Sequence, residues 1–172
     1  GLEADHREQD PDDGSDRGIT GTAAMTGVIN DAGAWFFLDT HVQLDPSAEQ
    51  IAEATMQATY RLKLFGVEPK VALLSHSNYG SHDNPSAAKM RKVREILKAR
   101  VPKLEVDGEM MADTAWNEAL RKRIFPNTTL SGRANLFVLP NLDAANITYN
   151  MFRVATDGVA IGPILMGISK PV

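Results

Sequence analysis

The sequence predicts an α/β fold built around a mainly parallel sheet. Three short apolar runs each break off into a cluster of small polar residues, after which a helical pattern begins. The runs are Val71–Leu74, Leu104–Val106 and Leu136–Leu139, and the clusters are Ser75–Ser81, Asp107–Glu109 and Pro140–Asn146. Short apolar runs bounded by turn-forming residues are typical of strands buried on both faces. Because ligands bind outside the carboxyl ends of such strands, the clusters indicate a binding crevice.

The first strand and the first helix are predicted between residues 34 and 66. Ala34–Leu38 is a compact apolar and aromatic run, which favours a strand. The helix opens at Ser47, which has capping-box spacing to Gln50. One buried stripe then follows at alternating spacings of four and three: Ile51, Thr55, Ala58, Leu62 and Phe65. Gly66 ends this helix.

Three more helices and a last strand complete the prediction. A helix that starts at Asn84 turns Met90, Val93 and Leu97 inward, and its other face is basic. The next begins near Asp113, buries Trp116 and Leu120, and stops at Pro126; the last runs from Asp143 to Phe152. Gly158–Leu165 is predicted as a strand interrupted by Gly162-Pro163.

Composition limits the classes of protein. The 172 residues contain no Cys, which excludes disulfides and thiolate metal sites and favours a reducing cytoplasm. No run approaches the roughly 20 apolar residues of a membrane span, and the start lacks the features of a signal peptide. The net charge of −4 does not favour a nucleic-acid partner. Residues 1–22, acidic and poor in apolar side chains, are predicted to be a disordered or linker segment.

The Ser-rich cluster has two readings that the sequence leaves open. A loop between a strand and a helix can present backbone N–H groups and hydroxyls to an anion, and the candidates are Ser75, Ser77, Asn78, Gly80 and Ser81. The cluster can equally be an ordinary turn whose Ser and Asn side chains satisfy the backbone. It matches neither the Walker pattern nor a full dinucleotide glycine pattern.

Metal sites have little support. His76 and His82 lack a recurring zinc-ligand spacing, and His41 after Asp39 is equally unsupported. A second group of side chains, Asp107, Glu109 and Asp113, is compatible with a magnesium ion or with acid and base chemistry. The competing interpretation, which we favour, is that Asp107 and Asp113 cap backbone amides around Gly108. We predict no metal site in this chain.

The third cluster adds two asparagines to the candidate site. Helix capping explains either Asn141 or Asp143. It does not explain Asn146, which lies one turn inside the helix and therefore faces solvent or holds a specific partner. No Ser-His-Asp order or nucleophile elbow is present, so we predict no catalytic residue.

From about Ala23 to Val172 the chain resembles the phosphate acetyl/butyryltransferase superfamily. It is most similar to the carboxyl-terminal acetyltransferase-like domain of bacterial NADP-dependent malic enzymes. The stretches that carry the resemblance are Asp39–Val42 with Asp45–Glu49, Lys70–Asn78, Asp107–Met110, Ala134–Asn146 with Tyr149, Gly162–Gly167, and Lys170–Val172. Ser75-His76-Ser77-Asn78 and Asp107-Gly108-Glu109-Met110 favour the malic enzyme branch.

The resemblance implies two three-layer α/β/α lobes, similar to isocitrate and isopropylmalate dehydrogenases, with a ligand crevice between them. Residues 23–161 would form the second lobe, and 162–172 would begin the segment that returns to the first. The implied acetyl-CoA or phosphate contacts are Ser75, Ser77, Asn78, Ser81, Asn141, Asn146, Arg153 and Lys170. A coenzyme-binding Arg of active members would align near Val154, one position from Arg153.

The resemblance also implies a function. Active acetyltransferases carry a Ser-Arg pair and an Asp just beyond the position of Val172, so we expect no acetyl transfer by this chain. We expect a regulatory domain that senses acetyl-CoA and builds a homo-oligomer. Malate oxidation, NADP and a divalent metal are expected in an amino-terminal malic enzyme domain. Two alternatives stay open: a fragment of an active phosphate acetyltransferase, and a purely structural oligomerisation lobe.

Overall fold

The fold, a computed structural model that describes residues 21–168, is one six-stranded sheet between two layers of helices. Its elements in chain order are β1 (Ala23–Asn30), β2 (Gly33–Leu38), α1 (Ala48–Leu64), β3 (Lys70–Leu74), α2 (Pro85–Arg100), β4 (Glu105–Met110), α3 (Ala112–Trp116), α4 (Glu118–Ile124), β5 (Leu136–Val138), α5 (Leu142–Ala155) and β6 (Val159–Met166). The strand order is β4-β3-β5-β2-β1-β6. The first four strands in this order are parallel, and β1 is antiparallel to both of its neighbours. The predicted α/β class is therefore confirmed.

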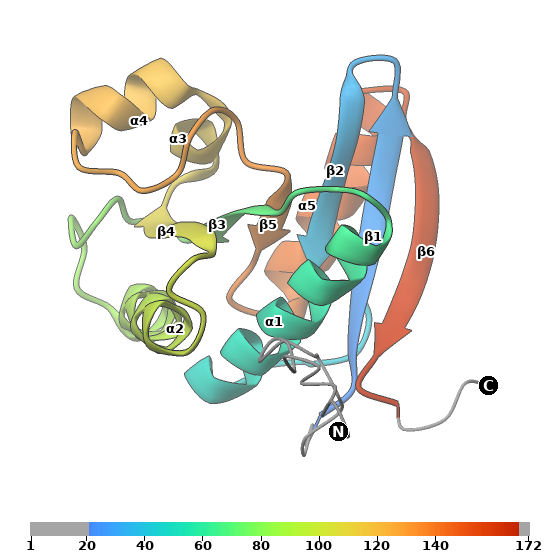
Figure 1. Cartoon of the computed structure of the whole chain (residues 1–172), viewed down its shortest axis with the longest axis horizontal. Helices are drawn as coiled ribbons and strands as arrows, with labels where there is room; N and C mark the ends of the chain where they lie inside the picture. Colours follow the sequence, from blue (N-terminus) through green and yellow to red (C-terminus); the bar gives the residue numbers. More distant parts are fainter. Residues whose placement is uncertain (1–20, 169–172) are drawn as a thin grey trace, which may run out of the picture.

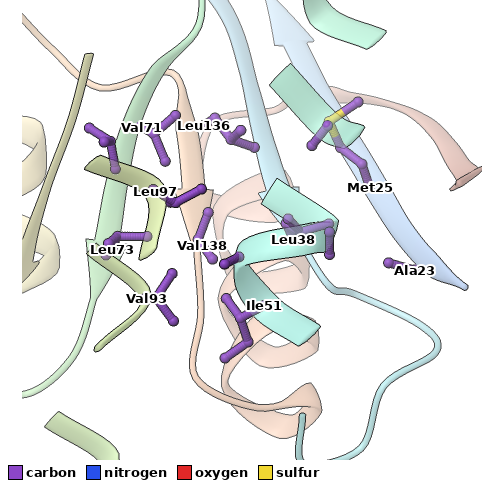
Figure 2. Close-up of a cluster of buried hydrophobic side chains, with 14 of the residues drawn as sticks. Ala23, Met25, Leu38, Ile51, Val71, Leu73, Val93, Leu97, Leu136 and Val138 are labelled. Atoms are coloured by element: carbon purple, nitrogen blue, oxygen red, sulfur yellow. The ribbon is translucent and has the colours of Figure 1, made fainter. Parts of the chain in front are cut away.

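Two apolar clusters lie on opposite faces of the sheet. On one face, side chains of β2, β3 and β5 meet Ile51 of α1 and Val93 and Leu97 of α2 (Figure 2). On the other, Phe37 and Phe137 meet Trp116 of α3 and Phe152 of α5. Figure 1 shows α1 in front of β2 and α5 behind it. Burial of apolar surface stabilises a fold by roughly 25 cal/mol per Å². The two clusters therefore hold both helix layers to the sheet.

The first strand of the sheet was missed by the sequence prediction, which placed the first strand at Ala34–Leu38. Those residues belong to β2, and β1 precedes them as the other arm of a hairpin. In β1 a glycine interrupts the apolar pattern, because Gly27 lies against the ring of Phe36: an added Cβ would be 2.9 Å from Cε1 of that ring. The close approach of β1 and β2 therefore explains why Gly27 stands in β1, where it breaks the apolar pattern that would predict a strand.

Two further boundaries differ from the prediction. The second apolar run, Leu104–Val106, does not stop before Asp107, because β4 continues to Met110 and buries both Asp107 and Glu109. The helix predicted from Asp113 is two short helices, α3 and α4, which meet at Asn117.

The largest fully buried side chain of this region is that of Arg121, whereas Trp116 and Leu120, which we predicted to be buried, are only partly buried. The Arg121 guanidinium donates to four carbonyl oxygens, those of Thr114, Ala115, Leu130 and Gly132. Carbonyl dipoles thus replace solvent around a buried cation, and the side chain joins both short helices to the loop that leads to β5.

The last strand, β6, runs through Gly162-Pro163 with a register shift opposite Met25 and Gly27. Gly162–Met166 therefore continue the same sheet, and the assignment of 162–172 to another lobe stays a prediction. Lys170 and nearly all of the predicted linker 1–22 lie outside the described residues. Among residues 21–168 no helix is long and apolar enough to cross a membrane.

Candidate functional site

The topology marks one edge of the sheet as the place for a ligand. The chain leaves β2 and β3 toward α1 and α2 on one face, but it leaves β5, which lies between these two strands, toward α5 on the other face. Where neighbouring parallel strands send their connections to opposite faces, the loops separate and leave a crevice. The loops at this crevice begin at Asp39, Ser75 and Leu139.

The loop after β2, residues 39–46, is fixed from several sides. The Asp39 carboxylate accepts hydrogen bonds from the backbone N–H groups of His41, Val42 and Gln43 at 2.9–3.0 Å. Lys89 Nζ donates to Asp45 Oδ1 at 2.8 Å and to the Pro46 carbonyl at 3.0 Å. The Leu142 N–H of α5 donates to the Leu44 carbonyl at 3.0 Å. This loop is therefore a rigid wall of the crevice, connected to both α2 and α5.

The Ser-rich loop uses its donors internally. Every backbone N–H from Ser77 to His82 donates to an acceptor of the protein. Ser75 Oγ accepts from Ser77, Ser81 Oγ from Asn78, and Ser77 Oγ from His82. The geometry matches the turn interpretation of this loop rather than a nest of free N–H groups.

Two of the candidate residues nonetheless have a side-chain donor without an acceptor within residues 21–168: the Ser75 hydroxyl and the Asn78 amide. Asn78 Oδ1 itself accepts the Met111 N–H at 2.8 Å. Ser77 is fully buried, whereas Ser81 is exposed. Of the five candidates in this loop, Ser75 and Asn78 thus keep hydrogen-bonding capacity for a ligand.

All three members of the acidic group accept hydrogen bonds from other groups of the protein. Asp107 Oδ1 accepts the Gly108 N–H, and Oδ2 accepts the Thr128 hydroxyl and the Thr129 N–H. Asp113 accepts the Thr114 N–H at 2.7 Å. The capping interpretation is therefore confirmed for Asp107. Asp113 lies in the first turn of α3, whose N-cap is Met111, and accepts the N–H of the next residue rather than one near Gly108. Within the described chain, no group of three or more His, Cys, Asp or Glu side chains is arranged to hold a metal ion.

The asparagines of the third cluster lie at the crevice. Asn141 caps α5 through the Ala144 N–H at 2.9 Å. Asn146 is not free in solvent: its Nδ2 donates to the Thr40 carbonyl at 3.1 Å, and its Oδ1 accepts from Asn150 Nδ2 at 3.2 Å. The residue that capping left unexplained therefore connects α5 to the loop after β2.

Arg153 is not brought together with these residues. It lies in the last turn of α5, seven positions after Asn146, which at about 1.5 Å per residue places it roughly 10 Å farther along the helix axis. Because α5 begins at the crevice, at the carboxyl ends of the parallel strands, and runs away from it, Arg153 lies toward the amino ends of these strands. The location of Lys170 is outside the described residues.

Two hollows are present near these loops. A cavity of about 10 Å³, room for one water molecule, lies between the ends of β2 and β5 beside Asp39, Gln43 and Asn141. The buried Gln43 Oε1 has no hydrogen-bond partner among the residues that the structure describes, so this cavity offers a water an acceptor. A groove of about 190 Å³ lies instead beside β4, between Tyr79 and Phe125 on one side and Arg91 and Arg94 on the other.

Two residues on the basic face of α2 contact the carboxyl half of β4. Arg91 pairs with the buried Glu109, and Arg94 Nη1 donates to the Gly108 carbonyl at 2.9 Å and lies 3.5 Å from Asp107 Oδ1. A buried carboxylate needs a cation or several hydrogen-bond donors nearby. The acidic residues after Val106 were therefore the sequence signal for these contacts of Arg91 and Arg94.

Most of the chain matches a protein family and several characterised enzymes in sequence. A family model described as phosphate acetyl/butaryl transferase matches residues 14–172. An NAD-dependent malic enzyme of Rhizobium meliloti is 48% identical over 92% of this chain and 20% of its own length. An NADP-dependent malic enzyme of Escherichia coli is 47% identical over 90% and 21%, respectively. A phosphate acetyltransferase of Paracoccus denitrificans is 40% identical over 81% of this chain and 44% of its own length.

Solved structures with the same fold are phosphotransacetylases. One from Streptococcus pyogenes superposes with a TM-score of 0.85 at 33% identity, covering 90% of this chain and 47% of that protein. EutD phosphotransacetylase from Staphylococcus aureus gives a TM-score of 0.83 at 27% identity, with coverages of 91% and 48%. The chain thus spans about half of these structures and about a fifth of the malic enzymes that it matches.

Proposed function

Because this chain belongs to the phosphate acetyl/butaryl transferase family, we propose that it is an acyl-CoA-sensing regulatory and assembly domain of a malic enzyme and does not itself transfer acetyl groups. The observation that carries the proposal is its 47–48% identity to two malic enzymes over only about a fifth of their length. Identity to the Paracoccus phosphate acetyltransferase is lower, at 40%. The predicted resemblance to the family is confirmed; the regulatory role is the step that we add.

The crevice supports the ligand part of the proposal. Polar side chains from three loops meet there on a rigid frame, and Ser75 and Asn78 retain donors for the phosphoryl or carbonyl oxygens of an acyl-CoA. Asn146 and, beyond the described residues, Lys170 complete the set that we propose. We leave Arg153 out of this set because α5 carries it away from the crevice.

The surface of α5 supports assembly. Ile147, Met151 and Val154 follow one another at spacings of four and three and are 63%, 66% and 71% exposed. Leu165 of the edge strand β6 pairs with Ala24 on the face of the sheet that α5 covers, and it is half-exposed. An apolar stripe of this kind is more typical of an interface than of a free surface. We propose that it contacts a second copy or the rest of the parent protein.

Malate chemistry is assigned to the remainder of the parent protein, which we propose holds the nicotinamide cofactor and a divalent metal. The two malic enzymes named above differ in their nicotinamide cofactor, so similarity gives no reason to choose between NAD and NADP. The role of this chain in that case is regulatory: an effector shifts activity only by binding two states unequally.

The test uses the full-length protein that carries this chain. Malate oxidation is measured with and without acetyl-CoA, for the natural protein and for a double variant Asn146→Ala, Lys170→Ala. We expect acetyl-CoA to change the rate and the double variant to reduce the ratio of the two rates. The control is Lys98→Gln, an exposed residue of α2. A protein whose rate does not respond to acetyl-CoA would refute the proposal, and an unchanged ratio in the variant would show that the site is elsewhere.

A second candidate, an active phosphate acetyltransferase, is favoured by the structural neighbours, which are phosphotransacetylases. Its test is direct: the full-length protein is supplied with acetyl phosphate and CoA, and thioester formation is followed. Sustained turnover would establish this candidate in place of the regulatory one.

A further inference from the structure

A chain of hydrogen bonds leads from β1 to an exposed imidazole in the loop after β2. Thr26 Oγ1 of β1 lies 2.7 Å from Thr40 Oγ1, and Thr40 Oγ1 lies 2.7 Å from His41 Nδ1. Both threonines are fully buried, whereas the His41 side chain is exposed. A buried polar chain that ends on an exposed titratable ring has no evident role in packing.

The positions of the hydrogens follow from counting donors and acceptors. The geometry of the Thr26–Thr40 contact allows either hydroxyl to donate. Within the described residues Thr40 is the partner of the buried Thr26 hydroxyl, so the arrangement that gives the Thr26 hydrogen an acceptor is the one in which Thr26 donates to Thr40. Thr40 then has one hydrogen of its own and two acceptors within reach, the Ala24 carbonyl at 3.5 Å and His41 Nδ1 at 2.7 Å. Since O–H donors prefer about 2.5–3.0 Å, the hydrogen goes to Nδ1.

The consequence is a defined tautomer. With Nδ1 accepting, the neutral imidazole carries its hydrogen on Nε2, the nitrogen remote from Thr40. The ring is also oriented from two other sides. The backbone N–H of His41 donates to Asp39 Oδ1 at 3.0 Å. The centroid of the Tyr149 ring lies 6.2 Å from that of the His41 ring. Asn146 donates to the carbonyl of Thr40, which fixes the residue before His41.

We propose that His41 Nε2–H is a ligand contact of the crevice that donates a hydrogen bond to an acceptor oxygen of the bound acyl-CoA. This inference rests on the proposed function and extends it to a residue that sequence reasoning considered only as a metal ligand and set aside. The acceptor is a phosphoryl oxygen or the thioester carbonyl oxygen, which share this chemistry. Holding the tautomer in advance saves the ligand the cost of ordering the ring.

The test compares two substitutions in the full-length protein. His41→Phe keeps an aromatic ring beside Tyr149 but has no N–H, whereas His41→Gln keeps an N–H donor on a side chain of similar reach. Calorimetric titration with acetyl-CoA is expected to show at least about a tenfold loss of affinity for His41→Phe, or about 1.4 kcal/mol, and a smaller loss for His41→Gln. Titration with CoA identifies the acceptor: an equal loss indicates a phosphoryl oxygen, and a loss confined to acetyl-CoA indicates the thioester oxygen.

A second readout examines the ring itself. Nitrogen NMR of labelled protein is expected to show the hydrogen of neutral His41 on Nε2 and to show a change of this signal on addition of acetyl-CoA. Natural affinity in His41→Phe would overturn the role of His41 and leave the proposed function standing. A hydrogen on Nδ1 would overturn the donor assignment. A natural protein that does not bind acetyl-CoA would overturn both proposals.

Discussion

Arg91 Nη1 lies 2.5 Å from Oε2 of Glu109, a carboxylate that is fully buried in β4. The other carboxylate oxygen accepts the Gly80 N–H at 2.9 Å, and the Glu109 carbonyl accepts the Tyr79 N–H at 2.8 Å. One residue of a strand therefore holds both α2 and the Ser-rich loop. Because this loop is a wall of the crevice, the ion pair positions the candidate site without touching it.

Removing the cation of this pair is expected to destabilise the protein strongly. Arg91→Ala leaves the Glu109 carboxylate buried with a single N–H donor, and the expected loss is about 3 kcal/mol in the free energy of unfolding. Urea unfolding measures it. The control is Lys92→Ala, since the neighbouring Lys92 is exposed and pairs with the exposed Glu95, so its loss should stay below about 0.5 kcal/mol. Equal losses in the two variants would contradict the prediction.

Gly108 is expected to tolerate no side chain. Its φ is +138°, and an added Cβ would lie 2.5 Å from the Leu73 carbonyl oxygen of the neighbouring strand. Gly66 at the end of α1 has φ +77° but open space around it, so it is the matched control. We expect about 1–2 kcal/mol of destabilisation for Gly66→Ala and at least about 3 kcal/mol for Gly108→Ala. Thermal or urea unfolding that ranks them equally would show that β4 moves to accept the methyl group.

Tyr79 is expected to give a pH-dependent contribution to stability. Burial raises the pKa of Tyr79 to about 12, and the nearby Asp107 carboxylate acts in the same direction. In the unfolded chain the tyrosine pKa is about 10, so the unfolded chain releases this proton first. The contribution is therefore present below pH 10 and is lost as the pH rises from about 10 to about 12.

The measurement is a titration of phenolate absorbance in the folded protein. The natural protein should show a late step near pH 12 that is missing in Tyr79→Phe. The Phe125 ring, 4.2 Å from that of Tyr79, should keep its stacking partner in this variant, so loss of the step reports the hydroxyl alone. A titration that is the same in both proteins would refute the assignment.

The exposed stripe of α5 is expected to control assembly. Met151→Glu places a charge in the middle of the stripe, and we expect the full-length protein to sediment as a smaller species. Leu64→Glu is the control, because Leu64 on α1 is 59% exposed and lies outside the stripe. An unchanged sedimentation coefficient in Met151→Glu would exclude this surface as an assembly contact.

The sequence by itself was sufficient for the elements whose signals are local. The capping box of Ser47 and Gln50 is present, and Asn84 and Asn141 begin their helices as N-caps. The inward stripe of Met90, Val93 and Leu97 is fully buried. These features depend on residues within one or two helical turns of each other, so their physical cause is contained in the sequence window that reveals them.

Only the tertiary structure decided what the polar residues do. Glu109 and Asp107 are strand residues because Arg91, Arg94, Thr128 and Thr129 come from other elements to satisfy them. Arg121, an ordinary basic residue in its window, is buried because four carbonyl groups surround it. The Thr40 hydroxyl, which contacts the His41 ring, also meets the hydroxyl of Thr26, 14 residues earlier in β1. Such roles depend on partners that are distant in sequence, since a buried polar group is stable only where the folded chain supplies its hydrogen bonds.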